Sequence, residues 1–251
     1  MSESESSPTR HGPRVWAIGG GKGGVGKSVI SANLAASLAH TGRRVAILDA
    51  DLGGANLHTL LGIPNPKINL KDFMSRKVSD LSDVMVPTPI DNLWLVSGAQ
   101  ALVEAANLNY GQKGKLLRHI HALEADHVIL DLGAGSAFNV LDFFLVARKG
   151  VLVVVPEPTS VENAYHFLKA ALFRKLKRAQ PRALVRAAIA EVMEGSSRDL
   201  VRTPRDLISR VWSVDPEAGA ALVAEASSFR PALIVNRAQH PSHEALGQDM
   251  V

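Results

Sequence analysis

One stretch of the chain constrains its fold more than any other: AIGGGKGGVGKSVI, from Ala17 to Ile30, which holds six glycines and two lysines. It fits the phosphate-loop pattern G-x-x-x-x-G-K-[ST] through Gly21, Gly26, Lys27 and Ser28. The apolar run RVWAIGG precedes it and a helical pattern follows it, which is the strand–loop–helix context that this pattern requires. The sequence therefore predicts a phosphate-binding loop, and the alternative is a glycine-rich turn that binds nothing.

The residue types of this loop suit a phosphate chain. Glycines let successive backbone N–H groups converge on phosphate oxygens, and a helix that starts near Lys27 presents about half a positive charge there. We expect Lys27 to bridge the β- and γ-phosphates and the Ser28 hydroxyl to hold Mg²⁺. The backbone cradle is predicted to be formed by Gly21, Gly23, Gly24, Val25 and Gly26.

Further apolar runs predict the rest of the sheet. They are GRRVAILDADLGG, NLWLVSG, HVILDLG, GVLVVVPEP and PALIVNR, and each ends in glycine, proline or polar residues. Helical patterns separate most of them, and Ile30, Leu34 and Leu38 form an apolar stripe on the first predicted helix. Strands that are apolar throughout and alternate with helices predict an α/β fold, a mostly parallel sheet with helices on both faces. Ligands of such sheets bind beyond the carboxyl ends of the strands.

One region breaks this alternation. No strand is evident from Ser160 to Arg230, and two helix starts there place a capping residue before a proline, Thr203 before Pro204 and Asp215 before Pro216. We therefore expect a helical insertion over about 171–230, before the last strand, within one domain covering 14–251. Within it, Leu207, Ile208, Val211 and Trp212 are expected to form one apolar helical face. Residues 1–13 are polar and are expected to form a disordered tail.

Composition narrows the class of protein. The chain has no cysteine, which excludes disulfides and thiolate metal sites and fits a reducing compartment. The amino-terminal residues MSESESSPTRHGPR contain no apolar stretch, so they are neither a signal peptide nor an anchor. The nine histidines show no carboxylate or cysteine at ligand spacing, so no metal cluster is expected. The default expectation is a cytoplasmic protein.

The second lysine of the loop carries a family resemblance. KGGVGKS resembles the deviant phosphate loop (deviant Walker A motif) of the MinD/ParA class of P-loop ATPases, in which an additional lysine, here Lys22, begins the loop. The resemblance extends over most of the chain. It implies that Lys22 reaches across a nucleotide-sandwich dimer to the partner's phosphates, where it acts as a catalytic charge together with Lys27. The alternative for Lys22 is a solvated loop lysine.

Three aspartates follow predicted strands. Asp49 and Asp51 stand two apart at the end of one strand, so in extended chain both point to one side, and Asp131 ends another strand. By resemblance to the family, Asp51 orients the attacking water, Asp49 contributes to the Mg²⁺ environment, and Asp131 is the Walker-B-type carboxylate that holds Mg²⁺ through water. Each could instead cap a helix or turn.

Other features refine the resemblance. Asn236 in IVNRA matches the family's asparagine that hydrogen-bonds the adenine, and the alternative is an ordinary strand-terminating asparagine. Relatives often have proline where Gly133 stands, which affects the conformation of that loop. VPEPTSVENAYHFLK and DLGGANLHTLLG resemble the flagellar-number regulators of this class. Iron–sulfur carriers of the same superfamily are disfavoured because no cysteine is present to hold a cluster.

Charge and chain end raise the question of partners. The net charge is only +4, but seven basic residues lie between Glu162 and Glu191 with no acidic residue among them. They are Lys169, Arg174, Lys175, Lys177, Arg178, Arg182 and Arg186. This basic stretch, 169–186, is a solvated face, a surface for another protein, or a grip on DNA or on an anionic membrane. The sequence ends at HPSHEALGQDMV, where relatives continue, so its carboxyl end is either truncated or shortened.

The resemblance implies a function. It is that of a molecular switch that binds ATP and Mg²⁺, forms a homodimer with ATP, hydrolyses it slowly under the stimulus of a regulatory protein partner, and positions flagella, division or motility apparatus. Such a switch works in the cytoplasm, or peripherally at the membrane or nucleoid. The alternatives are a ParA-like partition protein that binds DNA without sequence preference, and a nucleotide-dependent scaffold that does not hydrolyse ATP.

Overall fold

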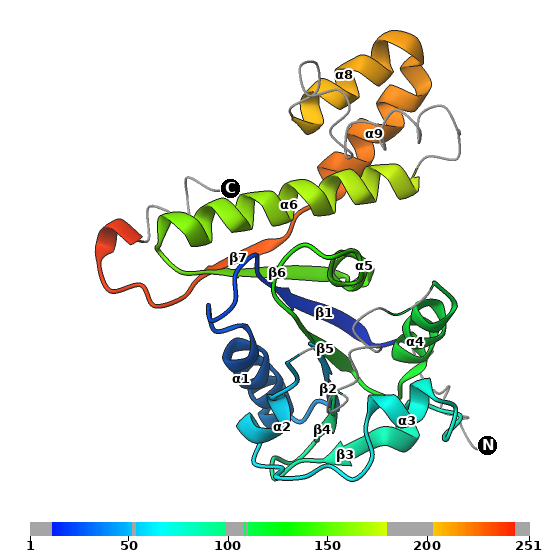
Figure 1. The fold of residues 1–251 in the computed structure, drawn as a ribbon, viewed down its shortest axis with the longest axis vertical. Helices are drawn as coiled ribbons and strands as arrows, with labels where there is room; N and C mark the ends of the chain where they lie inside the picture. The colour runs from blue at the N-terminus through cyan, green and yellow to red at the C-terminus, as the bar shows by residue number, and fades with distance from the viewer. Residues whose placement is uncertain (1–11, 52–53, 99–107, 109, 180–202, 244–251) are drawn as a thin grey trace, which may run out of the picture.

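A seven-stranded sheet forms the centre of the protein (Figure 1). The computed structural model describes residues 12–51, 54–98, 108, 110–179 and 203–243. The strand order is β3-β4-β2-β5-β1-β6-β7, and every neighbouring pair is parallel except β3 with β4. The predicted α/β architecture with a mostly parallel sheet is confirmed.

Six strands coincide with the apolar runs of the sequence. They are β1 (Arg14–Gly19), β2 (Val45–Ala50), β4 (Leu93–Val96), β5 (His127–Leu132), β6 (Lys149–Val154) and β7 (Ala232–Val235). The sequence did not predict β3 (Met85–Pro87), the antiparallel edge strand. It has three residues and ends at a proline, so its apolar run is too short to stand out.

Helices cover both faces of the sheet, as predicted. Residues of α1 (Lys27–His40) and α2 (Leu57–Leu60) pack with one face. The other face packs against α3 (Leu70–Met74), α4 (Tyr110–Ala122), α5 (Phe138–Val146) and the first half of α6 (Pro158–Ala179), and the short 3₁₀ helix η1 (Ser82–Val84) leads into β3.

The buried stripe of α1 differs from the one expected. The residues of α1 that are buried are Lys27, Ser31, Ala35 and Ala39. The larger Ile30, Leu34 and Leu38 are only partly buried and pack at the side of this stripe. Because the side chains of α1 that face the sheet are small, the helix axis can approach the sheet closely. This close approach brings Lys27 and Ser31 next to the carboxyl ends of the strands.

Two further helices gather on the far half of α6. A hydrophobic cluster joins Phe173 and Leu176 of α6 to α8 (Pro204–Val214) and α9 (Pro216–Ser228). Both helix starts are capped as predicted, because the Thr203 side chain accepts from the Asp206 N–H and the Asp215 side chain accepts from the Ala218 N–H.

The expected apolar face of α8 is only partly buried. Leu207 and Val211 are buried and Ile208 packs against them, whereas Trp212 is 46% exposed. Helix α9 passes close to α8 at Trp212, because a Cβ on Gly219 would lie 2.7 Å from Cα and 2.9 Å from Cε3 of Trp212.

Some sequence-based expectations fall outside the described residues. These are most of the amino-terminal tail, the middle of the predicted insertion at 180–202, the basic residues Arg182 and Arg186, and the chain end at 244–251. Among the helices that are described, none is long and apolar enough to cross a membrane.

Candidate nucleotide-binding site

The parallel register brings the predicted site residues to one edge of the sheet. In the pairing of the central strands, Asp131 of β5 lies opposite Asp49 of β2 and opposite Ile18 of β1. The loop that follows β1 therefore begins beside both carboxylates. Residues that are far apart in sequence meet here because strand direction is shared.

Gly26 shapes the end of the loop. It is the N-cap of α1, with φ 97°, a left-handed conformation that glycine adopts readily. A Cβ at this position would lie 2.3 Å from Nδ2 of Asn236, which donates a 2.8 Å hydrogen bond to the Val25 carbonyl. The structure thus brings Asn236 against the phosphate loop, although the two are more than 200 residues apart in sequence. Gly21 packs on the Asn163 carbonyl of α6.

Lys27 is the buried cation of the site. It is 8% exposed, and burial lowers the pKa of its ammonium, while the nearby charges of Asp131 and Asp51 act in the opposite direction. A buried lysine is costly without charged neighbours. The two carboxylates offset part of this cost, and they keep a positive group at the mouth of the loop.

Asp131 is surrounded by hydroxyl groups of α1. It is 1% exposed, and burial raises its pKa, whereas hydrogen bonds from Ser28 and Ser31 lower it. The Ser31 hydroxyl lies 2.8 Å from Oδ1 of Asp131. A carboxylate and a hydroxyl in contact are oxygen ligands of the kind that Mg²⁺ prefers, so Ser28 and Asp131 fit that ion. Sequence reasoning missed Ser31, although its place one helical turn after Lys27 could have indicated it.

Asp49 organises the chain that follows β2. It is 1% exposed, and burial raises its pKa to about 7, with the Asp131 charge acting in the same direction. Its two carboxylate oxygens accept the N–H groups of Asp51 at 3.2 Å and of Leu57 at 3.0 Å. Asp49 therefore ties the start of α2 to the end of β2 and fixes the backbone that carries Asp51.

Asp51 lies against the loop that follows Asp131. Its Oδ1 accepts the Gly54 N–H at 3.1 Å, and a Cβ on Gly133 would lie 3.1 Å from the same oxygen. Glycine at position 133 leaves room for this approach. The same loop reaches the phosphate loop, because the Gly135 N–H donates to the Gly20 carbonyl at 3.1 Å.

Lys22 is paired within its own chain. Its ammonium lies 2.9 Å from Oε2 of Glu157 and 3.1 Å from Oγ1 of Thr159, at the start of α6. The side chains of Lys22 and Glu157 are 41% and 54% exposed. Sequence reasoning gave no role to Glu157 or Thr159, although both lie in the VPEPTS segment that carried the family resemblance.

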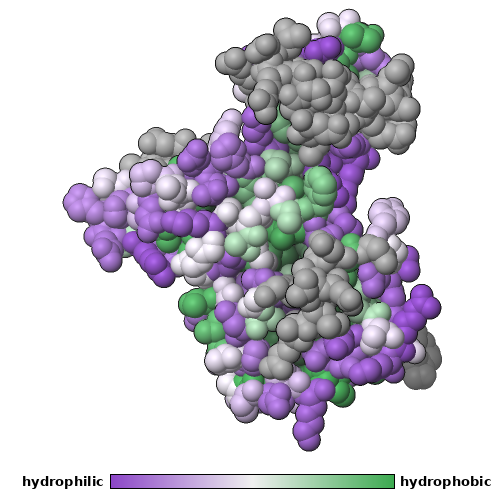
Figure 2. Space-filling model, in the orientation of Figure 1, coloured by the Kyte–Doolittle hydropathy of each residue, from purple (hydrophilic) through white to green (hydrophobic). Residues whose placement is uncertain are grey.

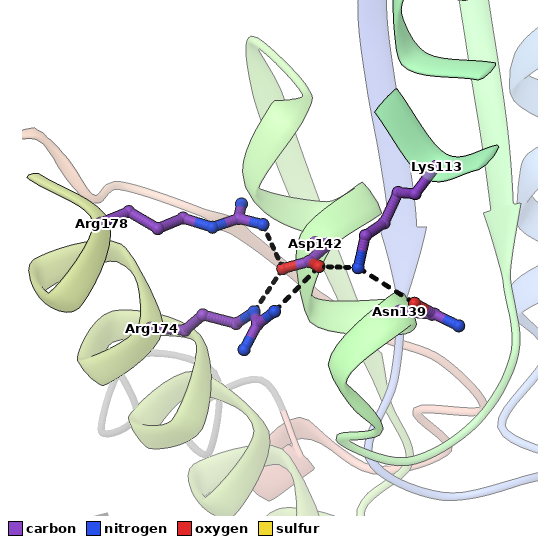
Figure 3. A network of polar contacts seen from close by, with 5 residues as sticks. All are labelled: Lys113, Asn139, Asp142, Arg174 and Arg178. Carbon is purple, nitrogen blue, oxygen red and sulfur yellow. Dashed lines mark hydrogen bonds and ion pairs between the residues drawn. The ribbon is translucent and has the colours of Figure 1, made fainter. Parts of the chain in front are cut away.

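The basic stretch is partly neutralised inside the protein. Arg174 and Arg178 of α6 form ion pairs with Asp142 of α5 (Figure 3). Lys175 of the same helix pairs with Glu225 of α9. These three ion-paired cations link α6 to α5 and α9. They are therefore not freely exposed cations of a surface for DNA or for an anionic membrane.

Fold and site together define a P-loop NTPase, in which a glycine loop, a buried lysine and two carboxylates meet at the carboxyl edge of a parallel sheet. A family model named ParA, described as NUBPL iron-transfer P-loop NTPase, matches residues 13–180. The chain belongs to this family. The resemblance to MinD/ParA proteins that the sequence indicated is confirmed.

Individual relatives include an antiactivator and a flagellum site-determining protein. The chain is 38% identical to the antiactivator FleN of Pseudomonas aeruginosa over 161 residues, which cover 63% of this chain and 56% of FleN. It is 33% identical to the flagellum site-determining protein YlxH of Helicobacter pylori over 162 residues, which cover 61% and 52%. The chain thus spans about half the length of the curated relatives it matches.

A solved structure supports the fold. The cell division ATPase MinD of Pyrococcus furiosus superposes with a TM-score of 0.56 over 86% of this chain and 98% of that chain, at 24% identity. A second neighbour is the septum site-determining protein MinD of Pyrococcus horikoshii, complexed with Mg-ADP, with a TM-score of 0.56 over 85% and 94% at 20% identity.

Proposed function

We propose that the chain is an ATP-dependent switch of the ParA family, which binds ATP with Mg²⁺, dimerises, and hydrolyses ATP to ADP and phosphate. One observation carries the proposal: the buried Lys27 lies near the charges of Asp131 and Asp51 at the end of a glycine loop, and the Ser31 hydroxyl of the same helix donates a 2.8 Å hydrogen bond to Asp131. Among the relatives, FleN is named an antiactivator, YlxH a flagellum site-determining protein and MinD a septum site-determining protein. The process controlled is therefore the placement or number of flagella, or of a related apparatus.

Nucleotide binding uses the loop and two oxygen ligands. The backbone N–H groups of 21–26 and the Lys27 ammonium bind the phosphates, and Asn236 binds the adenine. Ser28 and Asp131 would hold Mg²⁺, directly and through water, with Asp49 nearby to add negative charge. When bound, Mg²⁺ neutralises charge on the β- and γ-phosphate oxygens. The neighbouring structure of the Pyrococcus horikoshii protein is a complex with Mg-ADP.

Hydrolysis uses Asp51 and the two lysines. Asp51 orients a water molecule, whose oxygen attacks the γ-phosphorus while the bond to the β–γ bridging oxygen breaks. Lys27, and Lys22 from the second copy, stabilise the negative charge that the phosphoryl oxygens carry in the transition state. Asp49 supports this step by fixing the backbone of Asp51.

Dimerisation is part of the proposed chemistry. Lys22 must leave Glu157 to reach the partner's phosphates, so a chain without a partner copy lacks one catalytic cation. Turnover is therefore slow until ATP and a regulatory protein favour the closed dimer. We infer that this cycle takes place in the cytoplasm, or peripherally at the membrane or nucleoid.

Light scattering coupled to size-exclusion chromatography tests the proposal. In Mg-ADP we expect a mass near 26.8 kDa, and in a slowly hydrolysed ATP analogue about twice that value. Lys27→Ala should lose nucleotide binding, whereas Asp51→Ala should bind ATP, remain dimeric and lose turnover. A monomeric mass in both nucleotides, or equal turnover in wild type and Asp51→Ala, would overturn the switch.

A further inference from the structure

A cleft opens beside α5, on the side of the sheet opposite to α1. Its volume is about 550 Å³. It is lined by Leu108, Lys113, Ser136, Ala137, Phe138, Asn139 and Arg174, and we call it the α4–α5 cleft. On the face shown in Figure 2, hydrophobic surface gathers around α5 and the adjoining part of α6, with hydrophilic surface on either side.

The cleft borders a cluster with surplus positive charge. Asp142 is fully buried and contacts three cations: Lys113 of α4, and Arg174 and Arg178 of α6 (Figure 3). Among the described residues it is the one carboxylate that these three contact, so the cluster carries a net charge of about +2, three positive groups less one negative. Such a surplus attracts a further anion, and partial burial of the cations strengthens that attraction.

Two of these cations line the cleft itself. The side chains of Lys113 and Arg174 are only 11% and 19% exposed. The start of α5 adds to their field, because the N-cap residue is Ala137, which has no side-chain acceptor, and the positive end of the helix faces the same region. The electrostatics of the cleft therefore favour a carboxylate.

An aromatic ring completes the surface. Phe138 is 64% exposed, and the guanidinium of Arg174 lies 4.7 Å from the centre of its ring. This arrangement holds the ring beside the cations. An incoming segment can thus place a carboxylate near Lys113 and Arg174 and an apolar side chain on the free part of the Phe138 ring.

We propose that the α4–α5 cleft is a docking surface for an acidic segment of a partner protein, with an Asp or Glu beside Lys113 and Arg174 and an apolar neighbour on Phe138. A protein segment fits better than a nucleic acid or a membrane, because the cations are recessed and few, whereas a phosphate backbone needs an extended row of exposed ones.

The α4–α5 cleft lies next to the loop that follows Asp131. Ser136 and Ala137 line it and directly follow the loop that runs from Asp131 past Asp51. A bound segment therefore contacts the chain that connects the Mg²⁺ carboxylate to α5. This consequence rests on the proposed function, whereas docking itself does not.

The first experiment selects peptides that bind the full chain in Mg-ADP, from a display library of random twelve-residue peptides. We expect enrichment of Asp or Glu next to an aromatic or aliphatic residue. A selected peptide is then labelled with fluorescein, and its binding is measured by anisotropy beside a version in which each acid is replaced by its amide. The acidic form should bind at least tenfold tighter, as expected for hydrogen bonds to charged groups.

Variants localise the binding. Lys113→Gln should weaken the acidic peptide about tenfold, and Phe138→Ser should weaken both peptide forms severalfold. Phe138 is outside the Asp142 ion pairs, so this variant remains informative if Lys113→Gln unfolds. The matched control is Tyr110→Ser, which removes an aromatic that is 90% exposed on α4 but does not line the cleft, and it should bind as wild type.

Three outcomes would overturn the proposal: selected peptides without acidic enrichment, equal binding of acid and amide forms, or unchanged binding by both cleft variants. Competition by a duplex DNA or by phosphatidylglycerol vesicles, with no effect of Phe138→Ser, would assign the site to another class of partner and also overturn it. Calorimetry with ATP on the same variants separates this result from the proposed function, because nucleotide binding does not require the cleft.

Discussion

The ammonium of Lys22 lies 2.9 Å from Oε2 of Glu157 in its own chain, with Oγ1 of Thr159 at 3.1 Å. In the single chain, the lysine that would complete a partner's site is thus paired with a glutamate of its own chain. An exposed pair of this kind contributes at most about 1 kcal/mol. Its release is therefore a modest cost that ATP-driven dimerisation can overcome, and that cost can be measured.

Glu157→Gln should favour the dimer. Without the carboxylate, Lys22 loses its ion pair in the single chain. The dissociation constant of the ATP-analogue dimer should fall by up to about fivefold for each copy, or about 25-fold for both, at low salt. Sedimentation velocity across a range of protein concentrations measures this constant. Glu162→Gln, which alters an exposed acid on the same helix facing His166, should leave it unchanged. A weaker Glu157→Gln dimer would mean that Glu157 serves the dimer and not the single chain.

Gly133→Ala should slow hydrolysis and spare binding. The added Cβ would lie 3.1 Å from Oδ1 of Asp51, so the carboxylate must shift by a few tenths of an ångström from the place where, on the proposed function, it orients water. We expect turnover to fall about tenfold, with nucleotide affinity within about twofold of wild type. Gly114→Ala is the matched control, because no atom lies within 4 Å of a Cβ built there. Steady-state phosphate release and calorimetry separate the two effects, and an unchanged turnover would remove Asp51 from this role.

The raised pKa of Asp49 predicts a pH dependence of stability. Its folded-state pKa of about 7 lies above the ordinary value of 3.8 because the carboxyl is buried. Between these values the unfolded chain has lost the proton that the folded chain keeps, so the free energy of unfolding falls as pH rises, by up to roughly 1.4 kcal/mol per pH unit. Below pH 3.8 the carboxyl is protonated in both states, so its burial does not lower the free energy of unfolding. Above about pH 7 it is ionised in both states, and the loss of stability is complete.

Asp49→Asn should remove this part of the slope. Urea unfolding at several pH values between about 4.5 and 6.5, with a chelator present, gives the free energy of unfolding of both proteins. The wild-type curve should descend more steeply than that of the variant. Parallel curves would show that Asp49 titrates as an ordinary carboxyl.

Asn236→Ala should weaken adenine nucleotides. The variant loses the 2.8 Å hydrogen bond to the Val25 carbonyl and, on the proposed function, the contact to adenine. We expect about tenfold weaker ATP binding and a smaller preference for ATP over GTP, measured by calorimetry. Asn33→Ala removes a comparable bond to the Val29 carbonyl on the surface of α1 and should change neither value. If Asn236→Ala keeps the full ATP preference, the base is recognised elsewhere.

Local chemistry made much of this protein predictable. The glycine loop, the six long strands and both proline-led helix starts follow from residues close together in sequence, and each was found where expected. The meeting of Asp49 with Asp131 also followed, because parallel strands end at one edge.

What escaped prediction depends on contacts between distant residues. The pairing of Lys22 with Glu157 spans 135 positions, and the sequence around either residue gives no indication of it. The depth of Ser31 follows from how closely α1 approaches the sheet. Arg174 and Arg178 looked like part of a solvated basic face because their partner, Asp142, lies on another helix.

Helix α6 begins next to the residues that hold Lys22 and ends among α8 and α9. Its first half packs against the sheet through Phe167, and its second half belongs to the separate hydrophobic cluster around Leu176. At 1.5 Å per residue its 22 residues are about 33 Å long. One continuous helix therefore connects the residues that pair with Lys22 to the α8–α9 pair, and a single element belongs to both hydrophobic clusters.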